Sequence, residues 1–169
     1  MKPRLASAPP AAREDVIVFT VGGFSLAISA CVVSEVRSLE GLQPFSPGPE
    51  CECPEKVSFT MHRNGALYFV VDAARQFGLQ EARPGRILIL RLAATAVLVD
   101  TADRMAEISV LHALPQAFNG EERRWYRGLA MFGEDVVPVV NHQAFLAGSE
   151  LAAVRSAAAA VHAKGVAVV

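Results

Sequence analysis

Short runs of aliphatic and β-branched residues recur along most of the chain, and turn-forming residues separate them. Runs of this kind predict strands, because extended backbone favours branched side chains. The predicted strands cover residues 16–21, 24–31, 57–62, 67–71, 86–92, 96–99, 105–110, 126–132 and 136–140. Gly22-Gly23 and Asn64-Gly65 supply the positive φ angles of tight hairpin turns between neighbouring runs. The chain is therefore predicted to be mainly antiparallel β-structure.

Three segments depart from this pattern. Residues 32–38 fit either a continued strand or one helical turn. Residues 41–55 contain four prolines and are predicted to form a loop, because proline lacks the amide donor that a central strand needs. Residues 72–77 are predicted to form a short helix, with Asp72 as its N-cap and Gly78 as its stop.

The two ends of the chain differ from the middle. From Asn141 onwards apolar residues recur near helical spacing among many alanines, and Gly148 is a candidate interruption of this helix. These apolar residues are Phe145, Leu146, Leu151, Val154 and Val161. Residues 148–169 are predicted to be an Ala-rich helical tail, and residues 1–14 a disordered tail. We expect deletion of residues 149–169 to leave a folded core.

The strand pattern also predicts how the sheet closes. About nine short strands joined by hairpins lack the strand–helix–strand units of a parallel sheet. Antiparallel sheets of this kind hide their edges by curling into barrels. A length of 169 residues allows one domain, or one domain built from two small lobes.

Composition narrows the class of protein. The chain is 52% hydrophobic and 20% charged, which is typical of a soluble globular protein. Its net charge of -1 provides no basic field for nucleic acid or an anionic membrane. No apolar stretch approaches ~18 residues, so neither a transmembrane helix nor direct membrane insertion is expected. Three cysteines without a secretion signal predict reduced thiols and a cytoplasmic location.

Several segments together resemble a known family. They are Val16-Ile17-Val18-Phe19, Leu26-Ala27-Ile28, Val33-Ser34-Glu35-Val36, Val70-Val71-Asp72, Val97-Leu98-Val99-Asp100, and Gly128-Leu129 followed by Val136 to Asn141. Their order resembles that of the CheW-like domain family of bacterial chemotaxis coupling proteins, from about Val16 to Leu146. The predicted domain therefore covers residues 15–147.

The resemblance implies a fold and a function. The fold is two small five-stranded SH3-like β-barrels packed around a shared core, here with a C-terminal helical extension. The implied function is that of an adaptor, which bridges the cytoplasmic tips of chemoreceptors and the regulatory domain of a histidine kinase. Neither catalysis nor a cofactor is expected.

One turn departs from the family pattern. The family's Asn-Leu-Arg-Gly appears here as His62-Arg63-Asn64-Gly65, with the arginine one position early. A shift of one residue moves a strand side chain to the other face, so Arg63 need not replace the family arginine. The family proline before Val-Val-Asp is Phe69. These changes bear on receptor binding more than on the fold.

The first candidate binding surface combines Val33, Glu35 and Val36 with Arg63 and Asn64. The resemblance places it near the groove that accepts a receptor's helical tip, where apolar anchors with a polar rim are expected. The alternative is that Val33 and Val36 are core residues and that Asn64 only forms a turn.

Residues 123–127 are the one basic and aromatic cluster, with Trp125 and Tyr126 between arginines. Such mixtures occur in single-stranded nucleic-acid binders and also at protein–protein hot spots. Because Glu121 and Glu122 partly cancel the charge, we favour a protein interface or a loop packed on the barrel, and we expect no nucleic-acid partner.

Other candidate chemistry has a simpler interpretation. Asp72 and Asp100 each end an apolar run, and capping or turn closure is favoured over acid–base catalysis. Cys51-Glu52-Cys53 resembles part of a metal site, but its spacing is shorter than zinc sites normally use, and Cys31 and His62 lie at no recognised spacing. No metal site and no enzyme activity are therefore predicted.

Two other functions remain open. The first is a receptor-independent CheW-like module in a motility or cell-polarity pathway, which the altered turn at residues 62–65 favours. The second is a small-ligand-binding barrel, which requires a deep pocket with converging polar groups. A filled barrel interior would count against the second.

Overall fold

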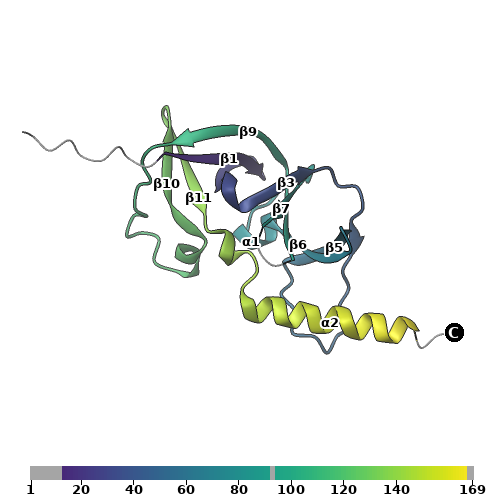
Figure 1. The fold of residues 1–169 in the computed structure, drawn as a ribbon. Coiled ribbons are helices and arrows are strands. Elements are labelled where there is room, and N and C mark those ends of the chain that lie inside the picture. The colour runs from purple at the N-terminus through teal and green to yellow at the C-terminus, as the bar shows by residue number, and fades with distance from the viewer. Residues whose placement is uncertain (1–12, 92–93, 167–169) are drawn as a thin grey trace, which may run out of the picture.

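The computed structural model describes residues 13–91 and 94–166 of the chain. Its strands lie in two sheets, and a long C-terminal helix lies beneath the second sheet (Figure 1). Most of the predicted N-terminal tail, residues 1–12, and part of one predicted hairpin, residues 92–93, lie outside the described residues.

The first sheet has five strands in the order β10-β11-β2-β1-β9. These strands are β1 (Glu14–Val21), β2 (Phe24–Ser29), β9 (Thr101–Ile108), β10 (Tyr126–Phe132) and β11 (Asp135–Val140). Neighbours pair antiparallel, except that β11 runs parallel to β2, with Val139 opposite Ala27. The antiparallel hairpins are as predicted. The parallel pair was missed, because it joins strands far apart in the sequence.

The second sheet has six strands in the order β3-β7-β8-β6-β5-β4. These strands are β3 (Val33–Arg37), β4 (Gln43–Pro44), β5 (Val57–Arg63), β6 (Ala66–Asp72), β7 (Arg86–Leu90) and β8 (Thr95–Val99). β6 and β8 pair in parallel. The extra strand β4 has two residues and lies at the sheet edge, where a proline does not interrupt a hydrogen-bond ladder on both sides.

Some strand boundaries differ from the prediction. β2 ends at Ser29, and a 3₁₀ turn, η1 (Ala30–Val32), leads into β3, so the ambiguous segment 32–38 is mainly a strand. β9 begins at Thr101, four residues before the predicted start. Most of its side chains are exposed, so no apolar run marked it in the sequence.

Alternate residues of the central strands face different cores. In β1, Val16 and Val18 point into the first barrel, whereas Ile17 and Phe19 join the core between the barrels. In β7, Ile87 and Ile89 fill the second barrel, whereas Leu88 and Leu90 join the core between the barrels. Burial on both faces explains why these strands read as continuous apolar runs.

Three apolar clusters therefore hold the molecule together. The first barrel is filled by Val16, Val18, Ala27, Ile108, Ala130, Val137 and Val139. The second barrel is filled by Met61, Val70, Ile87, Ile89, Ala96 and Leu98. The shared core includes Phe19, Ile28, Phe69, Val71, Leu88, Val97, Val99, Val140 and Phe145. The filled interiors count against a small-ligand-binding barrel.

Turns and caps follow the sequence signals. Asn64 and Gly65 have φ angles of 51° and 78°, as an Asn-Gly hairpin turn requires. Helix α1 (Ala73–Phe77) begins where the Asp72 carboxylate accepts a hydrogen bond from the Ala74 amide at 2.9 Å. It ends at Gly78, which has a left-handed φ of 63°.

Helix α2 (Gly148–Val166) begins at Gly148 rather than being interrupted there. Its residues Leu151 and Val154 belong to the shared core, Ala157 is buried, and Val161 on the same helix is half-exposed. The predicted helical tail is thus docked on the barrels. No helix within residues 13–91 and 94–166 is long and apolar enough to cross a membrane.

Candidate partner-binding surfaces

The predicted receptor-facing residues gather at β3 and at the turn between β5 and β6. Arg63 Nε donates a hydrogen bond to Glu35 Oε2 at 2.9 Å, and Arg37 Nε lies 3.5 Å from Glu35 Oε1. β3 is one edge of the second sheet, and β5 lies next to the other edge. The Glu35–Arg63 pair therefore links opposite ends of the curled sheet.

The guanidinium of Arg63 is paired with the Glu35 carboxylate and is not a free positive charge on the surface. The hydrogen bond from Arg63 to Glu35 raises the arginine pKa above its ordinary value, and Tyr68 adds to the effect. Because both partners are partly exposed, solvent screens the pair and its contribution to stability is small. Its main effect is to fix the direction of both side chains on the surface.

Val33 and Val36 have different surroundings. Val33 is 6% exposed and packs in the shared core, so the core interpretation holds for Val33. Val36 is 38% exposed, and nearby Leu39 is 37% exposed. Asn64 is exposed at the tip of its turn. We give the name β3 surface to six exposed or partly exposed residues: Glu35, Val36, Arg37, Leu39, Arg63 and Asn64.

Trp125 and Tyr126 lie in an aromatic cluster centred on Phe77. Phe77 stacks on Tyr126 with ring centroids 5.8 Å apart, and it meets Trp125 edge-on at 5.9 Å. Burial raises the pKa of Tyr126, and the charge of Glu122 adds to this. Because Trp125 and Tyr126 pack against Phe77, they resemble residues of a loop packed on the barrel more than aromatic rings that are free to stack on a ligand.

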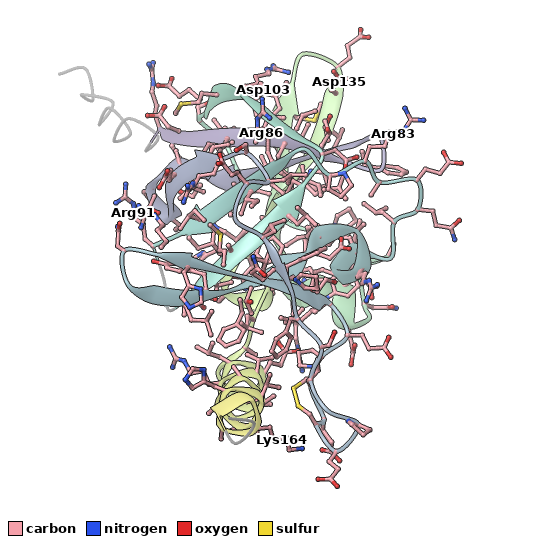
Figure 2. The ribbon with its side chains drawn as sticks, turned by 90° about the vertical axis from the view of Figure 1, so that its right-hand side faces the viewer. Arg83, Arg86, Arg91, Asp103, Asp135 and Lys164 are labelled. Atoms are coloured by element: carbon pink, nitrogen blue, oxygen red, sulfur yellow. A yellow bond between two sulfur atoms is a disulfide. The ribbon has the colours of Figure 1, made fainter. Side chains whose placement is uncertain are left out.

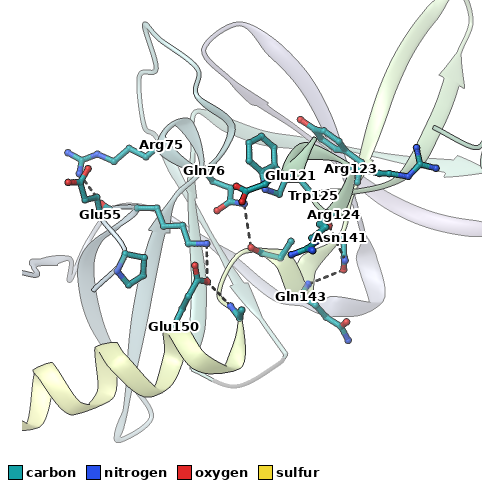
Figure 3. Close-up of a pocket in the computed structure, with 15 residues that line it drawn as sticks. Glu55, Arg75, Gln76, Glu121, Arg123, Arg124, Trp125, Asn141, Gln143 and Glu150 are labelled. Carbon is teal, nitrogen blue, oxygen red and sulfur yellow. Dashed lines mark hydrogen bonds and ion pairs between the residues drawn. The ribbon is translucent and has the colours of Figure 1, made fainter. Parts of the chain in front are cut away.

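These two residues line a groove of about 700 Å³ between the barrels and the start of α2, and many of its other lining residues carry polar or charged groups (Figure 3). Gln76 Nε2 donates to the Ala144 carbonyl at 3.4 Å across its floor, and Lys56 lies 3.0 Å from Glu150 Oε2 at its side. None of the β3 surface residues lines this groove. The structure thus separates Trp125 and Tyr126 from the other predicted site residues.

A further exposed set was missed from sequence. Phe24, Met131 and Val136 are 61%, 49% and 54% exposed. Met131 pairs with Val136, and the parallel register of Val139 with Ala27 places Val136 beside Phe24. We call these three residues the apolar row. Phe24 shares a strand face with buried residues of β2, so alternation alone could not reveal its exposure.

The two aspartates have structural roles, as favoured from sequence. Asp72 caps α1. Asp100 accepts hydrogen bonds from the amides of Gly22 at 2.9 Å and Arg83 at 3.0 Å, which ties together loops from both barrels.

The prediction of reduced thiols is wrong for two cysteines. Cys51 and Cys53 form a disulfide, while Cys31 is free and exposed. An odd number of cysteines shows only that at least one cysteine has no partner within the chain. It does not exclude a disulfide between two of the three, and Cys51 and Cys53 are close enough to form one. Among the residues that the structure describes, no group of three or more His, Cys, Asp or Glu side chains is placed to hold a metal ion.

Comparison with known proteins places the chain in a family. The model of the CheW-like domain matches residues 15–150. The chain belongs to the CheW-like domain family. The crystal structure of the scaffolding protein TtCheW from Thermoanaerobacter tengcongensis has the same fold, with a TM-score of 0.66 at 16% sequence identity. The match covers 88% of this chain and 96% of that one.

The CheW-like membership confirms the resemblance seen in the sequence, and the two barrel-like sheets confirm the predicted fold class. No curated protein matches the chain.

Proposed function

We propose that this CheW-like chain is an adaptor in chemotaxis-like signalling, which couples a chemoreceptor to a histidine kinase by protein–protein binding. The observation that carries the proposal is the presence of two separate exposed surfaces, one on each barrel. The apolar row lies on the first barrel and the β3 surface on the second. An adaptor needs two surfaces that can be occupied together.

The apolar row is assigned to the regulatory domain of the kinase. Its three large side chains stand on adjacent strands β2, β11 and β10. Contiguous exposed apolar side chains of this size are typical of interaction sites. A partner domain with the same barrel fold could cover the row by packing barrel against barrel.

The β3 surface is assigned to the helical tip of a chemoreceptor. Exposed Val36 and Leu39 would serve as apolar anchors. Glu35 and Arg37 alternate with Val36 along the edge strand β3 and point to its opposite face, where with Arg63 they would form a charged rim along the sheet edge. Helix-in-groove recognition uses this combination of anchors and rim.

The proposed mechanism is scaffolding without chemistry. Binding at both surfaces would favour one conformation of the kinase, and the difference in binding free energy between its conformations sets the size of the coupling. The adaptor would act in the cytoplasm, at receptor arrays on the inner face of the membrane, and it would use neither a cofactor nor a metal.

Titration calorimetry against the regulatory domain of a histidine kinase from the same organism tests the kinase half. We expect saturable one-to-one binding, and we expect Met131→Glu to weaken it at least about tenfold. Met105→Glu is the matched control, because Met105 is 66% exposed on β9 at the other edge of the first sheet. Absence of binding by the folded chain would contradict the proposal.

A receptor-independent module in a motility or polarity pathway is the second candidate. It is favoured by the engagement of Arg63 with Glu35, which leaves this arginine less available to a receptor. Binding of the kinase domain together with no binding of receptor tips would select it.

A further inference from the structure

The Cys51–Cys53 disulfide lies in the loop between β4 and β5, where this loop passes α2. Figure 2 shows the yellow sulfur–sulfur bond beside the helix. The two Cα atoms are 5.3 Å apart, which is a normal separation for a bonded pair. Neither the adaptor role nor the two proposed binding surfaces uses this feature.

The two sulfur atoms have different surroundings. Cys53 packs against the shared core, and its Sγ lies 3.8 Å from the Ala153 carbonyl of α2. Cys51 instead lines an open hollow of about 530 Å³ between the loop and α2. Ala157 and Lys164 form part of the opposite wall. A reagent entering the hollow therefore reaches Cys51 first.

We propose that Cys51 and Cys53 are a redox modification site that exchanges with dithiols, and that its oxidation state sets how firmly the loop holds α2. This inference is independent of the proposed adaptor function. The substrate class is a dithiol, either small or carried by a protein, and the oxidised form of such a molecule is the oxidant in the reverse direction.

The exchange proceeds in two steps. A thiolate of the dithiol attacks Cys51 Sγ, the bond to Cys53 breaks, and Cys53 leaves as a thiolate that takes a proton from water. The second thiolate of the dithiol then attacks the first sulfur of the same dithiol, which is bonded to Cys51 in the mixed disulfide. This step releases Cys51 as a thiolate, which takes a proton from water. Two electrons pass to the cysteine pair, and the dithiol becomes a disulfide.

Reduction changes the contact with α2. In the disulfide, Cys53 has no sulfur-bound proton to donate. As a thiol it becomes a weak donor facing the Ala153 carbonyl, where it competes with the helical amide that already bonds to this carbonyl. Residues 51–53 also lose the covalent ring that fixes their turn, so the loop is expected to hold α2 less firmly. The start of α2 stays anchored, because Glu150 accepts from the Ala147 amide at 2.8 Å and pairs with Lys56. The effect is therefore expected in residues 153–161.

Alkylation of the full-length chain with iodoacetamide, read by mass spectrometry, tests the redox site. Of the three cysteines, only Cys31 should react before reduction, and all three should react after dithiothreitol. Cys51→Ser and Cys53→Ser should each abolish the dithiothreitol-dependent change, whereas Cys31→Ser should retain it. If all three cysteines react with iodoacetamide after the chain has been equilibrated with oxidised dithiothreitol, the disulfide does not form under oxidising conditions and the proposal is wrong.

Hydrogen exchange tests the link to the helix. Reduction should speed the exchange of amides 153–161 on the order of fivefold, while those at the start of α2 change little. The Cys51→Ser, Cys53→Ser double variant should match the reduced protein without any reductant. Identical exchange in the oxidised, reduced and double-variant chains would refute control of α2 by the disulfide.

Discussion

At the scale of single residues, each of the two barrels has a Glu–Arg ion pair between strands from opposite ends of its sheet. In the second barrel Arg63 on β5 binds Glu35 on β3, and in the first barrel Arg127 on β10 binds Glu14 on β1. The second pair is bidentate, with Nη1–Oε1 at 2.7 Å and Nη2–Oε2 at 3.2 Å. Each pair joins an edge strand to the strand next to the opposite edge of its sheet. Ion pairs thus bring the two ends of each curled sheet together.

The Glu14–Arg127 pair predicts a pH-dependent contribution to stability. The hydrogen bond from Arg127 lowers the pKa of Glu14 below its ordinary 4.5, with help from Ser29 and against partial burial. A lowered folded-state pKa stabilises the protein above about pH 4.5, and this stabilisation is lost as the pH falls through the folded-state value. Glu14→Gln should cost about 0.5 kcal/mol near neutral pH, since the pair is partly exposed.

Chemical denaturation of the native chain and the Glu14→Gln variant across pH 3–7 measures this difference. The gap in unfolding free energy should be constant near neutral pH and should shrink below pH 4.5. Asp15→Asn, an exposed change on the same strand, is the control and should show no such gap. A gap that widens toward acid would contradict the assignment.

Gly22 predicts a second effect of a single residue. Its φ is +55°, and an added Cβ would lie 2.5 Å from the Gln80 carbonyl oxygen. Gly22→Ala should therefore cost roughly 2–3 kcal/mol of unfolding free energy. Gly23→Ala is the matched control, because its φ is +82° but no atom lies within 4 Å of the added Cβ. It should cost only about 1 kcal/mol, and equal losses would contradict the close approach.

At the scale of elements, α2 is an integral part of the fold. Val154 on α2 is fully buried in the shared core, beside Leu151. Because this helix face is buried, we expect deletion of residues 149–169 to lower the free energy of unfolding of the remaining core. The helix covers the second barrel beside Leu67 and Phe69 of β6.

A conservative change on α2 measures how much this docking contributes. Val154→Ala removes two buried methyl groups and should lower the unfolding free energy by roughly 2 kcal/mol. Val161→Ala, on a half-exposed turn of the same helix, should change it by less than about 0.5 kcal/mol. Thermal or urea unfolding of the two variants measures the difference. Similar losses of unfolding free energy in both would show that the docked face of α2 contributes little to stability.

Local signals in the sequence predicted the elements well and their long-range relations poorly. The Asn64-Gly65 turn and the Asp72 cap were readable because each depends on neighbouring residues. The parallel pairing of β2 with β11 was not, because no short-range pattern specifies a partner more than a hundred residues away. The start of β9 was missed since its side chains mostly face solvent.

The candidate binding surfaces were also only partly predictable, because they depend on contacts between residues far apart in the sequence. The sequence placed Glu35 and Arg63 in one region, but their ion pair depends on how the sheet curls. It could not separate buried Val33 from exposed Val36, which share an apolar segment. The apolar row was invisible because its three members come from three strands that only the fold brings side by side.

At the scale of the whole molecule, the shared core predicts joint unfolding of the two barrels. Side chains from both sheets, such as Phe19 and Leu88, pack in one cluster, so neither barrel keeps its packing when the other opens. Unfolding should be a single transition. The fluorescence of Trp125, the only tryptophan, reports the groove between the barrels, and far-ultraviolet circular dichroism reports all strands. The two melting curves should coincide, and separated midpoints would contradict joint unfolding.

The order of the strands along the chain has a consequence for synthesis. All strands of the second barrel lie between Val33 and Val99, whereas the first barrel is split, with β1 and β2 before this segment and β9 to β11 after it. A ribosome therefore releases every strand of the second barrel before the first barrel has its remaining partners. Strand β1 has an open edge until β9 emerges, and β2 has one until the β10–β11 hairpin emerges. This is the interval in which a nascent chain most needs protection from neighbours.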